Sequence, residues 1–516
     1  MTRLFLLFAF FHTASVFAAA DSFSFSNQFG PHAVGVKLIQ QYDRSRLYKT
    51  NVDLATGEAS TGELSRPVQT LVWYPAVRGG TPLTYRQYLE TIPTEDDFTR
   101  SAAEVKRMTD ERIEGNTGMR RDALLRDVAQ SMQAVRDAKP ASGRFPIVIY
   151  APGYSGSATE NADLCEYLAS QGYIVLSSAS LGAHSPGIGI DQDGAETQAA
   201  DISYLIGYAS TLPQADQSKV AVIGFSWGGL SNVYAAAKDA RIKALVSLDG
   251  SVRYFPQLVD GGKDAAKYVT PKQVAIPMLF MGAQPKTIET LNSKKNGTYY
   301  SFMNEMKYSD VYIITMLPMK HTNFTSFAMR LVPPQDFGDY TRDEISLAHS
   351  WTMLYTRHFL DAYLKDDAAG LKFINNTPIA NKAPPHMIIT DIRRKKDVAP
   401  VTQENFAQSL ANKGFDKAIP VYSQLVTQDA TFKLDSDQIY SWGLKLFQLN
   451  RLEQAREIFR LGTHLYPDQA FLQDGLAETL AKAGQIQEAI KSYQRVLELD
   501  SKNQDAIKYL KEHKAL

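Results

Sequence analysis

The sequence predicts an α/β domain, built on a mostly parallel sheet with a helical insertion, followed by an all-helical repeat region. Short apolar runs alternate with longer amphipathic segments from about residue 33 to residue 375. The later apolar runs are β-branched and apolar on both faces, as expected for parallel strands buried between helices. From about residue 403 the pattern is helical throughout and repeats itself.

Eight segments of the first region have the length and composition of strands. They are Val34–Ile39, Thr70–Tyr74, Pro146–Tyr150, Tyr173–Ser177, Val220–Ile223, Ala244–Leu248, Pro277–Met281 and Val311–Thr315. Helical patterns lie between them, for example Asn161–Ser170 and Gly229–Lys238. This alternation indicates a sheet covered by helices.

Two segments interrupt the alternation and suggest domain boundaries. Residues 84–139 are polar, charged and helical in pattern, and too long for a plain connection. We interpret them as a helical cap or lid, with a solvated surface excursion as the alternative. Residues 376–402 contain four prolines and a basic run, which is typical of a linker. The first domain is therefore expected over residues 21–375.

Residues 1–20 have the pattern of a signal peptide. Arg3 precedes a short apolar stretch, and the segment ends in three alanines before Asp21. We therefore expect an exported protein, periplasmic or secreted, and bacterial because Cys165 is the single cysteine and no disulfide framework can form. No later segment has the apolar length of a transmembrane span. Lys and Arg total 55, as do Asp and Glu, so net charge gives no reason to expect nucleic acid as a partner.

Residues 403–516 contain an internal repeat. Ala455 and Ala489 lie 34 residues apart, as do Phe459 and Tyr493, and a degenerate earlier copy occurs around residues 414–422. The period and the residue types resemble tetratricopeptide repeats, and three units satisfy the minimum for a stable solenoid. The resemblance implies a surface for a protein or peptide partner.

A candidate nucleophile follows the strand at Val220–Ile223. The chain there reads Gly-Phe-Ser-Trp-Gly from Gly224 to Gly228 and continues into a helical pattern, which is G-x-S-x-G in the strand, turn and helix context that this motif requires. Ser226 must occupy a tight turn so that its hydroxyl projects above the sheet. Gly224 and Gly228 remove side chains that would clash there.

Serine is a weak nucleophile and needs a base, which in turn needs an acid to orient it. His321 follows the last predicted strand and is our candidate base, because a loop at the end of the sheet can reach Ser226. Asp249 ends a strand in an Asp-Gly turn and is our candidate acid, while Glu289 is a more distant alternative. The other histidines after Ser226 lie in helical, linker or repeat segments: His349, His358, His386, His464 and His513.

The oxyanion formed during acyl transfer needs backbone N–H donors. One should come from Trp227, the residue after the nucleophile, and one from the loop after an early strand. Residues 151–156 fit that loop, where Gly153 permits a turn and Tyr154 supplies the N–H.

Five stretches together resemble the platelet-activating factor acetylhydrolase and dienelactone hydrolase branch of the α/β-hydrolases. They are Val72–Ala76, Pro152–Tyr154, Gly224–Gly229, Leu248–Gly250 and His321–Phe324. The resemblance implies an α/β-hydrolase fold and supports Asp249 and His321 as the partners of Ser226. Pro152 and Trp227 depart from the family pattern, which bears on the substrate range. Dienelactone hydrolases use a cysteine nucleophile, so Ser226 favours ester hydrolysis.

The sequence therefore predicts an exported serine esterase acting on a small-molecule or lipid ester, without a cofactor or metal ion. Acyl transfer or peptide hydrolysis by the same triad are alternatives. A non-catalytic scaffold whose repeats bind a partner is a third possibility.

Overall fold

The computed structural model describes residues 23–515, except residues 24, 54–55, 116–120, 285–301, 332–337 and 398–399. The predicted signal peptide, residues 1–20, and Glu289 lie outside the described residues. The chain divides into two compact units, residues 1–396 and 397–516. Among the described residues, no helix is both long enough and apolar enough to span a membrane.

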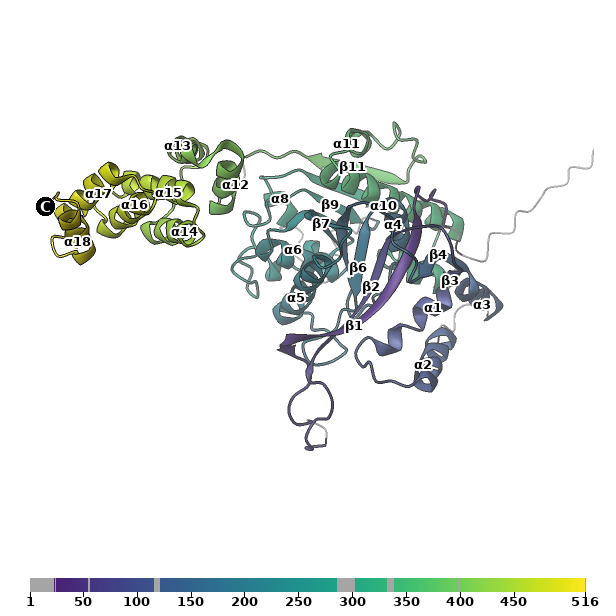
Figure 1. Cartoon of the computed structure of the whole chain (residues 1–516). Helices are drawn as coiled ribbons and strands as arrows, with labels where there is room; N and C mark the ends of the chain where they lie inside the picture. The colour runs from purple at the N-terminus through teal and green to yellow at the C-terminus, as the bar shows by residue number, and fades with distance from the viewer. Residues whose placement is uncertain are drawn as a thin grey trace, which may run out of the picture. The chain divides into compact units, whose positions relative to one another are not determined.

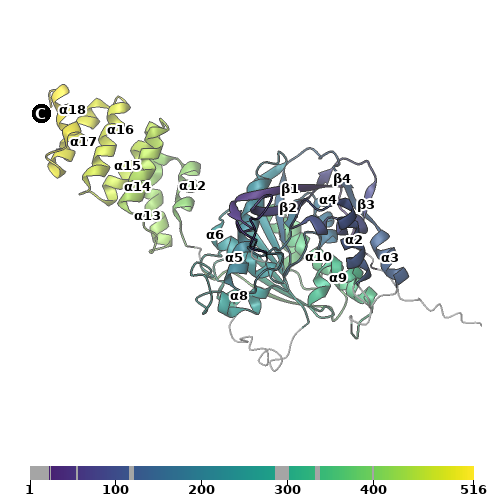
Figure 2. The ribbon, with the colours of Figure 1, turned by 90° about the horizontal axis from the view of Figure 1, so that it is seen from below.

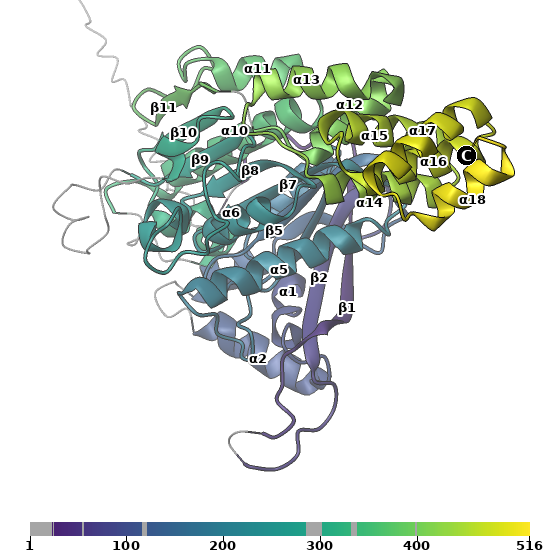
Figure 3. The same cartoon turned by 90° about the vertical axis from the view of Figure 1, so that its left-hand side faces the viewer.

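The described strands of the first unit form one sheet, in the order β11-β10-β9-β8-β7-β5-β6-β2-β1-β4-β3 (Figure 3). Strands β5 to β10 pair in parallel with one another, while β2 and the edge strand β11 run antiparallel to their neighbours. The strands are β1 (Ala33–Leu47), β2 (Ser65–Ala76), β3 (Pro82–Thr84), β4 (Ser131–Arg136), β5 (Phe145–Ala151), β6 (Ile174–Ser178), β7 (Ala215–Phe225), β8 (Ile242–Leu248), β9 (Met278–Gly282), β10 (Val311–Met316) and β11 (Ile388–Arg393). All eight predicted strands are confirmed.

Helices cover both faces of this sheet. Figure 2 shows α5, α6 and α8 on one side and α4, α9 and α10 on the other. The α-helices of the first unit among the described residues are α1 (Tyr85–Leu89), α2 (Ala102–Glu114), α3 (Arg121–Ala129), α4 (Ala162–Ser170), α5 (Gln192–Ala209), α6 (Gly228–Lys238), α8 (Phe302–Glu305), α9 (Ser326–Leu331), α10 (Arg342–Leu364) and α11 (Ala368–Asn375).

The central strands are apolar on both faces because each face belongs to a different core. In β5, Ile147 and Ile149 pack in the core that contains α5 and α6, whereas Val148 and Tyr150 pack in the core that contains α4 and α10. Successive side chains of a strand point to opposite faces, so a strand between two helical layers has no polar face.

The segment 84–139 forms α1, α2 and α3, as its pattern predicts, but it also adds β4 to the sheet beside β1 (Figure 1). Glu166 of α4 anchors it. The Glu166 carboxyl accepts hydrogen bonds from the backbone N–H groups of Gln133 (2.8 Å) and Ala134 (3.0 Å) in β4, and from the Tyr88 hydroxyl of α1 (2.7 Å). The segment is therefore tied to the first unit at two points of its length. Its role as a lid stays a prediction.

The interpretation of residues 376–402 as a plain linker misses a strand. Residues Ile388–Arg393 form β11 and pair with β10 along its whole length. The first unit therefore extends beyond residue 375, to residue 396. The sequence pattern does not predict this strand, because prolines and basic residues flank it. The strand is also partly exposed at the edge of the sheet, where polar residues are tolerated.

The second unit is helical throughout its described residues. Its helices are α12 (Gln403–Lys413), α13 (Ala418–Gln428), α14 (Ser436–Gln448), α15 (Leu452–Leu465), α16 (Ala470–Lys482), α17 (Ile486–Leu499) and α18 (Gln504–Glu512). Helices α14, α16 and α18 begin 34 residues apart, as do α15 and α17. A Cβ atom at Gly443 or Gly475 would lie 2.7 Å or 2.5 Å from the Phe459 ring, so these glycines let α14 and α16 approach α15 closely.

Candidate active site

Ser226 lies on a sharp turn between β7 and α6. Its φ angle is 49°, a left-handed conformation that a residue with a Cβ atom adopts at a cost. A Cβ atom at Gly224 would lie 2.1 Å from the Gly228 carbonyl oxygen, and one at Gly228 would lie 2.1 Å from the Ala151 carbonyl oxygen. Both glycines are therefore required for the turn that carries the predicted nucleophile.

The structure brings the three predicted triad residues together. His321, in a short 3₁₀ turn after β10 (His321–Phe324), places its Nε2 atom 2.8 Å from Ser226 Oγ and its Nδ1 atom 2.6 Å from Asp249 Oδ2. The Phe225 ring packs against the imidazole, with 4.9 Å between ring centroids. The His321 side chain is 43% exposed, so a substrate can reach it. This geometry permits proton transfer from Ser226 to His321.

Asp249 is held in a fixed orientation beneath His321. The residue follows β8, and its side chain is fully buried. Its Oδ1 atom accepts hydrogen bonds from the Tyr254 hydroxyl (2.9 Å) and the Ala283 N–H (3.1 Å), and Oδ2 faces His321. Burial alone would raise the pKa of this carboxyl, but these hydrogen bonds and the imidazole outweigh burial and hold the pKa below its usual value. Asp249 therefore stays ionised and stabilises a protonated His321.

The two predicted oxyanion donors come from two turns, the elbow (Gly224–Gly228) that carries Ser226 and the turn after β5. Trp227 stands at the N-terminus of α6, and Tyr154 lies in the turn after β5. That turn is closed by a hydrogen bond from the Gly156 N–H to the Gly153 carbonyl (3.0 Å). Within the part of the chain that the structure describes, neither the Tyr154 nor the Trp227 amide donates a hydrogen bond to another residue. Both amides can therefore bind a developing negative charge, which the N-terminus of α6 also favours.

Two glutamates, the buried Glu95 and the half-buried Glu160, hold the oxyanion turn (residues 152–156) and the chain that follows it, although no sequence pattern points to them. Glu160 accepts hydrogen bonds from the Gly153 N–H (2.9 Å) and the Tyr150 hydroxyl (3.0 Å). Glu95, between η1 (Ile92–Thr94) and α2, accepts one from the Ala158 N–H (2.7 Å). Burial raises the pKa of Glu160 to about 7 and that of Glu95 to about 8. No local sequence signal marks them, because their burial depends on the tertiary fold.

The other histidines do not join the triad. His349 is buried in α10, where its Nδ1 atom lies 2.8 Å from the Asn323 carbonyl oxygen and supports the turn that carries His321. Burial lowers the pKa of His349 to about 4. His358 stacks on Phe373, with 4.0 Å between ring centroids. Both residues pack within the first unit and lie outside the triad. Among the described residues, no three His, Cys, Asp or Glu side chains are arranged to hold a metal ion.

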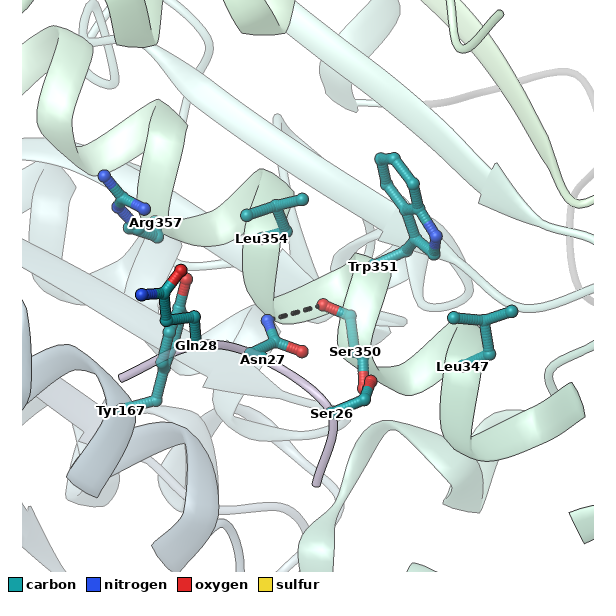
Figure 4. A pocket seen from close by; sticks show the side chains of 9 residues that line it. All are labelled: Ser26, Asn27, Gln28, Tyr167, Leu347, Ser350, Trp351, Leu354 and Arg357. Atoms are coloured by element: carbon teal, nitrogen blue, oxygen red, sulfur yellow. Dashed lines mark hydrogen bonds between the residues drawn. The ribbon is translucent and has the colours of Figure 1, made fainter. Parts of the chain in front are cut away.

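Two cavities of the first unit differ in their relation to the triad. One, of about 590 Å³, lies between the 84–139 segment and the oxyanion turn, and Ser155 and Gly156 form part of its wall. We call it the insertion cavity. The other, of about 330 Å³, lies between residues 26–28 and α10 (Figure 4). There the Asn27 side chain donates a hydrogen bond to the Ser350 carbonyl (2.9 Å), and the cavity wall includes no triad residue.

Comparison with known proteins relates the first unit to hydrolases. The sequence model of the X-Pro dipeptidyl-peptidase (S15) family matches residues 73–370, more than half of the chain, and this range includes the triad residues and both oxyanion donors. A putative carboxymethylenebutenolidase of Synechocystis sp. is 30% identical over 169 residues, which cover 30% of this chain and 68% of that protein. The solved structure of a ferulic acid esterase from Streptomyces cinnamoneus aligns with a TM-score of 0.47 at 18% identity, over 69% of this chain and 96% of its own.

The family match lies within the first unit. The resemblance to platelet-activating factor acetylhydrolases and the resemblance of the second unit to tetratricopeptide repeats both stay predictions. The family match covers β3 to β10, the elbow and the loops that carry Ser226, Asp249 and His321. The chain is an α/β-hydrolase and belongs to the X-Pro dipeptidyl-peptidase (S15) family.

Proposed function

We propose that this protein hydrolyses carboxylic esters through Ser226, His321 and Asp249. Ser226 Oγ attacks the ester carbonyl carbon while His321 Nε2 accepts its proton. The tetrahedral oxyanion binds the N–H groups of Tyr154 and Trp227. His321 then donates the proton to the leaving alcohol, and water releases the acid from the acyl-enzyme by the same route.

The observation that carries this proposal is the continuous hydrogen-bond chain at the elbow. The distances of 2.8 Å from Ser226 Oγ to His321 Nε2 and 2.6 Å from His321 Nδ1 to Asp249 Oδ2 are those of a base in contact with its nucleophile and its orienting acid. The buried and ionised Asp249 favours a charged imidazole during the reaction. The similarity to a putative carboxymethylenebutenolidase also supports ester chemistry.

The test is hydrolysis of p-nitrophenyl esters from acetate to palmitate by the full chain. Ser226→Ala should abolish hydrolysis and also block labelling by a fluorophosphonate probe. Ser210→Ala, which changes an exposed serine at the end of α5, is the matched control and should do neither. A folded protein that hydrolyses no ester and does not react with the probe would contradict the proposal and favour a scaffold role.

Peptide hydrolysis is a second candidate, which the family match favours. The same triad can cleave an amide, with His321 protonating the leaving amine. Hydrolysis of an Ala-Pro-p-nitroanilide can be compared with that of an alanine p-nitrophenyl ester. A higher kcat/KM for the anilide, lost in Ser226→Ala, would assign the protein as a peptidase.

We also propose that the second unit is a tetratricopeptide-repeat domain that binds a protein or peptide. The 34-residue spacing of the helices and the packing of Phe459 against Gly443 and Gly475 support this assignment. A cavity of about 760 Å³ between α12 and α14, whose wall includes Trp442 and Ser441, offers a binding surface. A photo-crosslinker at Ser441 should capture a partner that the same group at Ser423, outside this cavity, does not.

Export is the remaining part of the proposal. The signal-peptide pattern supports cleavage after Ala20. Mass spectrometry of the protein recovered from its native host should show a chain that begins at Asp21, and an intact N-terminus would contradict export by this route.

A further inference from the structure

The order of the strands separates the two sides of the candidate active site. Ser226 follows β7, and His321 follows β10, with β8 and β9 between them. Tyr154 follows β5, and β6 lies beyond β5 on the side away from β10. At the carboxyl edge of the sheet, therefore, His321 lies on one side of Ser226, and the oxyanion turn and the end of β6 lie on the other.

This order decides where the two halves of an ester must lie. The leaving oxygen has to be close to His321 Nε2, because that atom donates its proton. The carbonyl oxygen occupies the oxyanion site. The remaining substituent of the carbonyl carbon, the acyl group, is consequently directed away from His321 and toward β5 and β6.

The insertion cavity lies on that side. Its wall includes Ser155 and Gly156, which directly follow the predicted oxyanion donor Tyr154. Ala179 and Leu181, just beyond β6, also form part of the wall. Its volume of about 590 Å³ is in the range of small-molecule sites and far exceeds the needs of an acetyl group. The apolar side chains of the wall are Ile92, Pro93, Met108, Ala179, Leu181 and Pro186.

Glu95 is one of the polar residues of the wall, which also includes Asp96, Arg100, Glu111, Arg112 and Ser155. The residue is only 7% exposed, and one of its oxygens accepts the hydrogen bond from the Ala158 N–H. Burial raises the pKa of Glu95 to about 8, and the nearby Arg112 and the Ala158 N–H only partly oppose this, while Asp96 and Glu160 add to it. An uncharged carboxyl can both donate and accept a hydrogen bond, so it suits a hydroxyl or an amide.

The other carboxylates of the cavity wall have cationic partners. Asp96 pairs with Arg100, and Glu111 pairs with Arg107 at 2.7 Å. These pairs satisfy the charges of Asp96, Arg100 and Glu111, so these three groups do not favour a charged substrate.

We propose that the insertion cavity is the acyl-binding site, and that it takes a bulky, uncharged acyl group with an apolar body and one hydroxyl or amide group that hydrogen bonds with Glu95. The proposal rests on the proposed ester hydrolysis and specifies its substrate class. It also gives the 84–139 segment a role in substrate selection, because η1 and α2 form one side of the cavity.

The test compares three p-nitrophenyl esters: acetate, 3-phenylpropanoate and 3-(4-hydroxyphenyl)propanoate. The full chain should give the highest kcat/KM with the hydroxylated ester and the lowest with acetate. Met108→Trp fills the cavity from α2 and should lower kcat/KM for phenylpropanoate about tenfold more than for acetate. Ala103→Trp, on an exposed part of α2 outside the cavity wall, is the matched control and should change neither value.

Glu95 is tested by the ratio of kcat/KM for the two phenylpropanoates. Glu95→Met should reduce the preference for the hydroxyl about two- to tenfold, and Glu95→Gln, which keeps a donor and an acceptor, should retain it. Equal losses on all three esters in Met108→Trp, or an unchanged ratio in Glu95→Met, would overturn the acyl-site proposal while ester hydrolysis stands. Failure of the unaltered chain to hydrolyse any ester would overturn both.

Discussion

The substitution Asp249→Asn tests the triad most sharply, because the structure fixes how the new amide must lie. In the folded protein, Oδ1 of Asp249 receives hydrogen bonds from the Tyr254 hydroxyl and the Ala283 N–H, and Oδ2 receives one from His321. The asparagine oxygen must therefore keep the Oδ1 position, facing two donors. Its NH₂ group then faces His321 Nδ1, which must accept a hydrogen bond instead of donating one.

This exchange puts the imidazole proton on the wrong nitrogen. With Nδ1 as an acceptor, Nε2 carries the proton and cannot accept the Ser226 proton. In other serine triads the same change lowers kcat about 10⁴-fold with little change of geometry, which corresponds to about 5 kcal/mol of transition-state stabilisation. We expect a loss of this size in kcat for the best p-nitrophenyl ester, with a small change in KM. The fluorophosphonate labelling rate of Ser226 should fall in parallel.

Asp366→Asn is the control for loss of a carboxylate. Asp249 and Asp366 both have positive φ angles, 43° and 54°, but the Asp366 side chain is 90% exposed, so its substitution should leave the rate unchanged. A folded Asp249→Asn protein with a kcat within about tenfold of the unaltered chain would refute the reasoning. If Glu289→Gln then abolished activity, the acid would be Glu289.

Three further predictions concern stability. The pKa of Glu160 is raised from 4.5 to about 7 in the folded chain. Between these pH values the folded chain keeps a proton that the unfolded chain has lost. The free energy of unfolding should therefore fall as the pH rises from 4.5 to about 7. Urea unfolding from pH 4.5 to 8 should show that Glu160→Gln flattens this slope by up to about 1.4 kcal/mol per pH unit. Gly228→Ala should lower the free energy of unfolding by roughly 3 kcal/mol or more, because its Cβ atom meets a carbonyl oxygen of β5. Gly207→Ala, in α5 and facing open space, should raise the free energy of unfolding by about 0.5–1 kcal/mol, as measured by thermal unfolding. Gly475→Ala should lower the free energy of unfolding of the second unit by about 1–3 kcal/mol, because the new Cβ atom clashes with Phe459. Its melting temperature should fall accordingly, while ester hydrolysis stays unchanged.

The strands could be predicted where both faces are buried. Val220–Ile223 and its neighbours are continuous apolar runs, because helices cover the sheet on both sides. The sequence does not predict β3, β4 and β11, since they are short or lie toward the edges of the sheet, where polar residues alternate with apolar ones. In β4, only Met132 and Ala134 are buried, and so brief an alternation does not differ from the helical pattern around it.

In the candidate site, too, features set by neighbouring residues could be predicted, whereas contacts between residues far apart in the sequence could not. The elbow is a local motif, because Gly224, Ser226 and Gly228 lie within five residues, and a Cβ atom at Gly224 would meet the Gly228 carbonyl. Asp249 and His321 could be predicted from their places after strands. Glu95 could not, since its partner Ala158 lies 63 residues away and only the fold brings the two together.

Glu95 and Glu160 connect substrate selection to the oxyanion turn. Glu160 holds Gly153, the residue before the Tyr154 amide, and Glu95 holds Ala158, two residues before Glu160. Glu160 belongs to the chain that leaves the turn. Glu95 belongs to the 84–139 segment, which also forms a wall of the insertion cavity. An acyl group that displaces the Glu95 side chain would therefore shift residues 158–160, and with them Glu160. For this reason, substitutions at Glu95 should affect kcat as well as KM, whereas substitutions at Met108, a residue of the cavity wall, should act on the discrimination between acyl groups.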